Sequence, residues 1–312
     1  MKNIIFIGTN YFAASVLKKL LKKKINITNV ITKNNKKIGR GQIIKPHPVS
    51  IAAKQNKIKV NTTENINSIE IKNIIKNINP NIIIMIEYGE KIDNKTINIP
   101  THGIINLHPS ILPQFRGPAP IQHTIINGNK ETGVSIISIN ENIDLGDILN
   151  IVKCKIKHTD TYISLSKKLI NIGTECLITT LNEIENKTIK KYKQDKHQSS
   201  YAPKFNNNYY KINWYDSALN INRKIRAFFN IKKFTTNIDE NEIKIIETII
   251  IKRKKQTIPG TIIKINTYGI DVMTNENAIR IKKIQFPGKK INIIKNILNS
   301  KKDLFKIGNK FE

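Results

Sequence analysis

An asparagine and a histidine lie two residues apart in the stretch "IINLHPSILPQFRGPAP", residues 104–120. On an extended strand, residues i and i+2 point to the same side, so Asn106 and His108 are expected to share one space while Leu107 faces away. An amide can donate hydrogen bonds and an imidazole can exchange a proton near neutral pH. The spacing therefore predicts one half of a catalytic site. A structural Asn–His pair at the end of a strand is the alternative interpretation.

Two acidic residues, Asp144 and Asp147, flank a glycine in "NENIDLGDIL", residues 140–149. They follow an alternating strand pattern over residues 133–139, and strand ends are a common place for catalytic side chains. Taken alone, the segment is more typical of an ordinary turn. The sequence pattern by itself therefore favours the turn over a catalytic role.

Strand and helix patterns alternate over the first two hundred residues, which indicates βαβ units. The pattern predicts a doubly wound, mostly parallel α/β domain over 1–187, and Asn106 then ends one of its strands. Residues 188–208 are polar and nearly free of periodicity, which indicates a linker. One helix and several short strands cut by turns predict a smaller β-barrel domain, OB-like, over 209–312. The expected strands of the first domain are 3–8, 27–33, 81–86, 103–106 and 133–139, and its expected helices include 69–79, 119–127 and 161–184.

The chain has 312 residues, two cysteines and a formal net charge of +30. The net charge is +17 over residues 1–208 and +13 over the much shorter 209–312, so the second domain is the more basic per residue. A polyanionic partner such as nucleic acid fits this charge, and solvated lysines are the alternative. No pattern of a disulfide framework, a metal site, a signal peptide or a membrane helix is present, so a cytoplasmic protein without a metal is expected.

An ordered series of short motifs along nearly the whole chain resembles the methionyl-tRNA formyltransferase family. The motifs are "GTNYFA", "GRGQIIKPHPVSIAAKQNKI", "NLHPSILPQFRGPAPIQ", "GNKETGVSIISINENIDLGDIL", "SYAPK", "NW", "KIRAFF" and "IQFPGKK". The resemblance implies transfer of a formyl group from 10-formyltetrahydrofolate to the α-amine of methionyl initiator tRNA. It implies that Asn106, His108 and Asp144 are catalytic, with Asn106 donating to the developing oxyanion and Asp144 orienting His108.

The resemblance also implies where the folate donor binds. Residues Ser110, Ile111, Leu112 and Pro113 are expected to line the tetrahydrofolate pocket, with Tyr88 and Gly89 beside it. Two nearby segments depart from the family. Glu87, Glu90 and Lys91 stand where an apolar stretch is usual, and Asn10 and Tyr11 replace a proline and an acid.

Basic residues in three segments, 33–49, 252–254 and 289–290, are the expected tRNA contacts. The long loop 33–49 matches an insertion that contacts the acceptor end in the family, and Arg40 occupies its basic position; arginine suits this task because its guanidinium can pair with phosphate or stack on a base. Phosphate contacts are expected from further basic residues of the three segments, Lys33, Lys36, Lys37, Lys45, Lys252, Arg253, Lys254, Lys289 and Lys290.

Two other functions share part of this pattern. A formyltransferase acting on a small amine, such as glycinamide ribonucleotide or an amino sugar, would keep the same catalytic residues without needing the basic segments. A non-catalytic RNA-binding protein would need the basic segments and not the catalytic residues. No membrane and no obligate protein partner are implied.

Overall fold

The computed structural model describes residues 3–38 and 42–312 of the chain. The residues group into two compact units. The first unit comprises Met1–Pro120, Glu131–Ile156 and Ser166–Pro203, and the second comprises Ile121–Lys130, Lys157–Leu165 and Lys204–Glu312. Each unit is described by itself.

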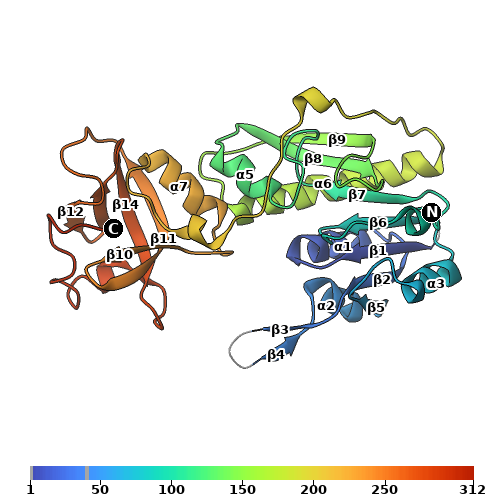
Figure 1. The fold of residues 1–312 in the computed structure, drawn as a ribbon, viewed down its shortest axis with the longest axis horizontal. Coiled ribbons are helices and arrows are strands. Elements are labelled where there is room, and N and C mark those ends of the chain that lie inside the picture. Colours follow the sequence, from blue (N-terminus) through green and yellow to red (C-terminus); the bar gives the residue numbers. More distant parts are fainter. Residues whose placement is uncertain (1–2, 39–41) are drawn as a thin grey trace. The chain divides into compact units, whose positions relative to one another are not determined.

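A seven-stranded sheet in the order β5-β2-β1-β6-β7-β8-β9 forms the centre of the first unit (Figure 1). The pairs from β5 to β7 are parallel, whereas β7–β8 and β8–β9 are antiparallel. The predicted mostly parallel sheet is therefore confirmed. The strands are β1 (Ile4–Gly8), β2 (Ile27–Lys33), β5 (Lys59–Thr63), β6 (Ile82–Ile86), β7 (Ile104–His108), β8 (Glu131–Ser138) and β9 (Ile148–Lys155).

Continuous apolar runs explain why β1 and β6 lie in the middle of this sheet, next to β7. All five residues of β1 and of β7 are buried, as central parallel strands require. The connecting helices are α1 (Tyr11–Lys22), α2 (Pro48–Gln55), α3 (Ile69–Ile78), α4 (Asn94–Ile97) and the long α6 (Tyr162–Glu185). Asn10 caps α1, because its Oδ1 accepts a hydrogen bond from the Ala13 backbone N–H at 3.0 Å.

A small hairpin lies within the long basic loop of the first unit. It pairs β3 (Lys36–Ile38) with β4 (Ile43–Lys45) in antiparallel register, and Figure 1 shows it extending away from the sheet. The sequence pattern predicted a loop here. The sequence pattern did not predict strand β9.

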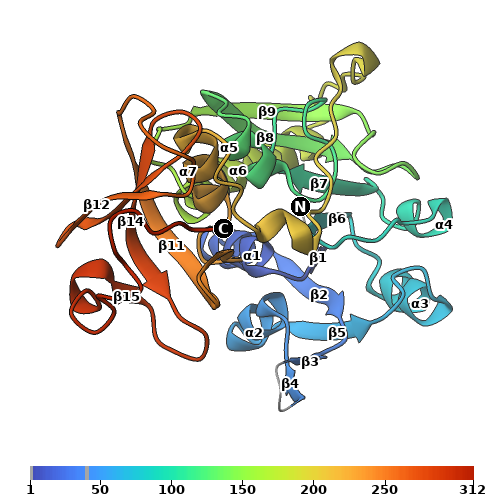
Figure 2. The ribbon, with the colours of Figure 1, turned by 60° about the vertical axis from the view of Figure 1, so that its left-hand side comes forward.

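An antiparallel sheet in the order β10-β11-β14-β13-β12, with β15 beside β14, forms the second unit (Figure 2). This agrees with the predicted small barrel-like domain. Its core contains the fully buried rings of Phe228, Phe234 and Phe311, and Trp214 donates from Nε1 to the Thr236 hydroxyl at 2.8 Å. The elements are α5 (Pro120–Ile126), α7 (Ala218–Ala227), β10 (Phe234–Ile238), β11 (Asn241–Ile251), β12 (Ile262–Asn266), β13 (Gly269–Met273), β14 (Ala278–Gln285) and β15 (Asn292–Ile293).

Residues 188–203, which we call the strap, belong to the first unit although the sequence pattern indicated a linker over 188–208. Backbone hydrogen bonds join Tyr192 to Ile148 in both directions, at 2.8 and 2.9 Å. Further along, Ser200 accepts from the Arg116 N–H at 2.9 Å and Ala202 donates to the Arg116 carbonyl at 2.7 Å. The strap is therefore held along its length without forming a regular strand.

In the part of the chain that the structure describes, no helix combines the length and the apolar character that crossing a membrane requires.

Candidate active site

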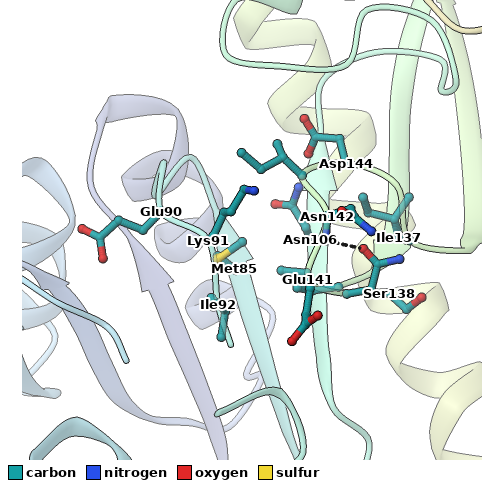
Figure 3. A pocket seen from close by; sticks show the side chains of 14 residues that line it. Met85, Glu90, Lys91, Ile92, Asn106, Ile137, Ser138, Glu141, Asn142 and Asp144 are labelled. Atoms are coloured by element: carbon teal, nitrogen blue, oxygen red, sulfur yellow. Dashed lines mark hydrogen bonds between the residues drawn. The ribbon is translucent and has the colours of Figure 1, made fainter. Parts of the chain in front are cut away.

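Asn106 lies on the wall of a pocket at the carboxyl edge of the sheet. It is paired in register with Met85 of β6 and Ile137 of β8, and it is 8% exposed. The pocket has a cavity volume of about 50 Å³ and opens to solvent, and both Asn106 and Asp144 line it (Figure 3). Among the described residues none hydrogen-bonds the Asn106 side chain, so its amide is available to a bound molecule.

The other walls of this pocket come from the loop after β6 and the loop after β8. Met85, Glu90, Lys91 and Ile92 line one side, and the opposite side is formed by residues 137–144 with Gly146. Figure 3 shows the Lys91 side chain extending toward Asn106 while Glu90 points away from the pocket. The pocket thus combines an apolar floor with polar groups at its edges.

His108 is buried beside the pocket, and both of its ring nitrogens face oxygen atoms. Nε2 lies 2.8 Å from the Phe115 carbonyl oxygen, and Nδ1 lies 3.6 Å from Oδ1 of Asp144. A carbonyl oxygen only accepts hydrogen bonds, so Nε2 carries a proton and donates it to Phe115. The Nδ1 edge is therefore the one that can exchange a proton, next to the Asp144 carboxylate.

Asp144 is held in place by its own loop and by the Arg-Gly turn. Its Oδ2 accepts a hydrogen bond from the Gly117 N–H at 2.8 Å, and its backbone has a positive φ of 55°. Gly117 has a φ of +102°, which favours glycine. A Cβ atom at Gly146 would lie 1.6 Å from the Ser138 carbonyl oxygen, so only glycine fits there. Both glycines thus allow the close backbone packing that positions the Asp144 carboxylate.

Gln194 of the strap is a positioning residue that sequence patterns did not reveal. Its Nε2 donates to the carbonyl oxygens of Asp144 at 2.7 Å and Gly146 at 2.8 Å. Its Oε1 accepts from Nε and Nη2 of Arg116 at 3.0 and 2.8 Å. One side chain therefore joins the Asp144 loop to the Arg-Gly turn, and Arg116 anchors that turn.

Glu87 follows β6 at the same edge of the sheet, and it too was not among the predicted site residues. Its backbone has a positive φ of 51°, its carbonyl accepts from the Thr9 hydroxyl at 2.7 Å, and Oε2 accepts from Asn10 Nδ2 at 3.1 Å. Burial raises the pKa of the Glu87 carboxyl to about 7; the Asn10 hydrogen bond opposes this rise and the negative charge of Asp144 adds to it.

Comparison with known proteins assigns the chain to a family. The model of the formyl transferase family matches residues 1–181, and that of the formyl transferase C-terminal domain matches residues 204–302. The methionyl-tRNA formyltransferase of Buchnera aphidicola subsp. Acyrthosiphon pisum (strain Tuc7) is 38% identical over 307 residues, which cover 98% of each chain. The chain belongs to the methionyl-tRNA formyltransferase family. The predicted formyl-transferring enzyme is therefore confirmed, and a non-catalytic protein is not favoured.

Two solved structures share the fold of this formyltransferase. HypX from Aquifex aeolicus in complex with tetrahydrofolic acid has a TM-score of 0.66 at 14% identity, and the match covers 96% of this chain and 47% of HypX. An N-formyltransferase from Helicobacter canadensis in complex with folinic acid and dTDP-3-aminofucose has a TM-score of 0.64 at 24% identity, covering 90% and 99% of the two chains. The chain spans about half the length of HypX.

The structure does not bring the predicted folate-binding residues of this formyltransferase to the pocket wall. Tyr88 is 3% exposed in an isoleucine-rich core. The Ser110 hydroxyl donates to the Gln114 carbonyl at 2.6 Å, and the Leu112 N–H donates to the Ser135 hydroxyl at 3.0 Å. The Ser110 hydroxyl and the Leu112 N–H are thus already paired within the protein. Of the remaining predicted residues, Ile111 and Pro113 are half-buried and Gly89 is exposed, and none of the three lines the pocket.

The predicted tRNA-binding residues lie in different settings. The Lys33 ammonium forms an ion pair with Glu90 at 3.0 Å and lies 5.3 Å from the centre of the Tyr88 ring, so it is engaged within the first unit. Lys36 and Lys37 are on β3, and the exposed Lys45 is on β4. Arg40 lies outside the described residues. The C-terminal candidates are all exposed: Lys252, Arg253 and Lys254 after β11, and Lys289 and Lys290 after β14.

Within residues 3–38 and 42–312, no group of His, Cys, Asp and Glu side chains is arranged to hold a metal ion.

Proposed function

We propose that the enzyme transfers the formyl group of 10-formyltetrahydrofolate to the α-amine of methionyl initiator tRNA, with Asn106, His108 and Asp144 as its catalytic residues. The observation that carries this assignment is the pocket in which the unpaired Asn106 amide faces the same space as Asp144. Curated relatives named methionyl-tRNA formyltransferase support the acceptor. Because the acceptor is used in translation, we infer a cytoplasmic enzyme.

The pocket suits the ring system of a folate. Its apolar residues Met85, Ile92 and Ile137 offer contact to a flat heteroaromatic ring, and the backbone of the loop after β8 offers hydrogen-bonding groups to the edge of that ring. When bound, the donor supplies the formyl carbonyl that the amine attacks. We therefore assign the donor to this pocket, and the folate contacts expected from the Ser110–Pro113 segment stay a prediction.

Asn106 acts on the charge that develops during transfer. Attack of an amine on a carbonyl builds a negative oxygen, and a fixed amide N–H donor stabilises that oxygen more than it stabilises the neutral carbonyl. The pocket wall fixes Asn106 through its strand register, and its side chain breaks no existing hydrogen bond in order to donate. Because Nε2 of His108 already donates to Phe115, we assign the oxyanion to Asn106 and not to the imidazole.

His108 and Asp144 act on the proton that the amine must lose. The Nδ1 edge of His108 and the Oδ1 atom of Asp144 face each other at 3.6 Å, so the carboxylate stabilises positive charge that develops on the ring when Nδ1 accepts a proton. The Gly117 N–H holds the Asp144 carboxylate in place by donating to its Oδ2 atom. The pair can therefore take up the amine proton without moving any backbone.

Three basic segments are the proposed RNA contacts. The β3–β4 hairpin carries Lys36, Lys37 and Lys45, and Arg40 falls between these residues in the sequence. In the second unit, exposed basic residues follow the ends of two strands. They are Lys252, Arg253 and Lys254 after β11, and Lys289 and Lys290 after β14. Phosphate contacts of this kind supply salt-dependent affinity without sequence choice.

The test is formylation by the purified protein with 10-formyltetrahydrofolate. Methionyl initiator tRNA, methionyl elongator tRNA, glycinamide ribonucleotide and an amino sugar are compared as acceptors. We expect turnover with methionyl initiator tRNA that is lost in His108→Ala. Turnover restricted to a small amine, or turnover that persists in His108→Ala, contradicts the proposal.

A further inference from the structure

Lys91 is a charged side chain of the pocket that the catalytic roles assigned above leave unused. It lines the same pocket as Asn106 and Asp144, and its side chain extends toward Asn106 (Figure 3). Among the residues that the structure describes, Lys91 is the only basic one on the pocket wall. The pocket therefore combines one ammonium group with the amide that the proposed reaction uses.

The backbone at Lys91 is fixed by contacts on both sides of it. Glu90 points away from the pocket and forms an ion pair with Lys33 at 3.0 Å. Ile92 is 2% exposed in the isoleucine-rich core. The Lys91 carbonyl itself accepts a hydrogen bond from Nδ2 of Asn67 at 3.0 Å. The side chain of Lys91 thus starts from a fixed point on the pocket wall.

The Lys91 ammonium forms no ion pair within the described part of the chain. Glu141 and Asp144 also line the pocket, and neither of them is paired with Lys91. The ionic partner of Asp144 is the His108 ring, at 3.6 Å. A positive charge without a protein partner raises the electrostatic potential in the space around it. A negative charge that develops in this pocket is therefore stabilised.

We propose that Lys91 is a further catalytic residue: its ammonium group lies with the Asn106 amide beside the formyl oxygen and stabilises the negative charge that develops there. This inference rests on the proposed function of the site. The amine nitrogen bonds to the formyl carbon while an electron pair of the C=O bond moves to the oxygen. The pair returns as the bond from this carbon to N10 of the donor breaks, and N10 takes up the proton that the amine gave up. Lys91 keeps its own protons throughout and acts through its charge.

The first test compares kcat and the donor KM of Lys91→Met with those of the unaltered enzyme. Methionine nearly keeps the length of the side chain and removes its charge. We expect kcat to fall roughly five- to fiftyfold while the donor KM stays within about twofold, because the oxygen becomes negative only during transfer. This loss is smaller than for a buried donor, since Lys91 is exposed and water screens its charge.

Two further variants accompany this measurement. Lys91→Arg keeps the positive charge and should recover most of the turnover. Lys95→Met, at an exposed position of α4, is the matched control and should change neither value. A raised donor KM with unchanged kcat shows that Lys91 binds another part of the donor, such as its carboxylate tail, and overturns the proposal.

The second test measures binding without any acceptor. Two stable 10-deaza analogues of tetrahydrofolate are compared by isothermal titration calorimetry, one with a carboxylate and one with a neutral carboxamide in place of the formyl group. Both carry the same carboxylate tail, so a contact with the tail affects both equally. We expect Lys91→Met to weaken binding of the carboxylate analogue roughly five- to fiftyfold and that of the carboxamide by less than about twofold. Lys91→Arg should retain most of the affinity for the carboxylate.

The outcomes separate this inference from the proposed function. Equal weakening of the two analogues, or no weakening, overturns the role of Lys91. Selective weakening of the carboxylate analogue, in an enzyme that formylates a small amine and not methionyl-tRNA, keeps the role of Lys91 and rejects the proposed acceptor. An unaltered enzyme that binds neither analogue rejects the proposed function together with this inference.

Discussion

Replacing Gln194 tests whether the strap is part of the catalytic machinery. Gln194→Met keeps the length of the side chain and removes its four hydrogen bonds. Gln194→Glu retains the oxygen that accepts from Arg116 and turns the donor toward Asp144 and Gly146 into an acceptor. The two variants therefore distinguish the anchoring of the turn from the anchoring of the catalytic loop.

The size of the effect follows from the hydrogen bonds that are lost. The two bonds from Nε2 measure 2.7 and 2.8 Å and join neutral groups. Each such bond contributes about 0.5–1.5 kcal/mol, so together they stabilise the Asp144 loop by about 2 kcal/mol. Arg116 is half-buried and can turn to water, so its two bonds add little. If the loop must be ordered for turnover, about 2 kcal/mol corresponds to a loss of roughly 10- to 100-fold in kcat/KM.

The assay is steady-state formylation at saturating donor, with thermal unfolding recorded in parallel. We expect both variants to lose kcat/KM while Tm falls by a few degrees at most, with Gln194→Glu the more affected because its carboxylate faces two carbonyl oxygens. Gln198→Met, at an exposed position of the strap, is the matched control. Unchanged kcat/KM in Gln194→Met refutes the reasoning, and so does a loss that only follows a general loss of folded protein.

Three further outcomes are expected. Asn106→Ala should lower kcat by roughly 10²- to 10³-fold with little change in tRNA affinity, measured by single-turnover kinetics and filter binding; equal losses in both would contradict an oxyanion role. Glu87→Gln should raise stability more at pH 8 than at pH 4.5: the folded pKa, about 7, lies above the unfolded value, so stability is lost as pH rises between them. A Tm difference independent of pH would contradict this. Lys252→Ala and Lys254→Ala should each reduce the slope of log affinity against log salt by roughly one; an unchanged slope removes that lysine from the interface.

The central strands could be predicted from the sequence because their side chains are buried on both faces. A short, continuous apolar run such as Ile82–Ile86 is typical of a central strand in a parallel sheet. The spacing of Asn106 and His108 was equally informative, because the period of a strand decides which side chains share a face. Asp144 carried no such signal, and only its resemblance to a family motif marked it.

Other parts of the site depend on contacts that leave no trace in a local pattern. The Gln194 side chain works through four hydrogen bonds in a segment without periodicity, and nothing in the residues around it distinguishes it from the exposed Gln198. Strand β9 alternates only weakly because it is an edge strand whose outer residues are partly exposed. The turn after β7 folds back and brings the Phe115 carbonyl oxygen to 2.8 Å from Nε2 of His108. This contact determines which ring nitrogen carries the proton, and the local sequence pattern does not show it.

The strap also sets where the catalytic module can be separated from the rest of the polypeptide. A fragment that stops at residue 187 would retain every strand of the seven-stranded sheet but would lack Gln194 and Ser200. Limited trypsin digestion offers the same cut, because Lys190, Lys191, Lys193 and Lys196 are all exposed on this segment. If the hydrogen bonds of Gln194 are needed for turnover, a nick that releases it lowers activity while both hydrophobic cores stay intact, and an excised catalytic module has to extend to Pro203.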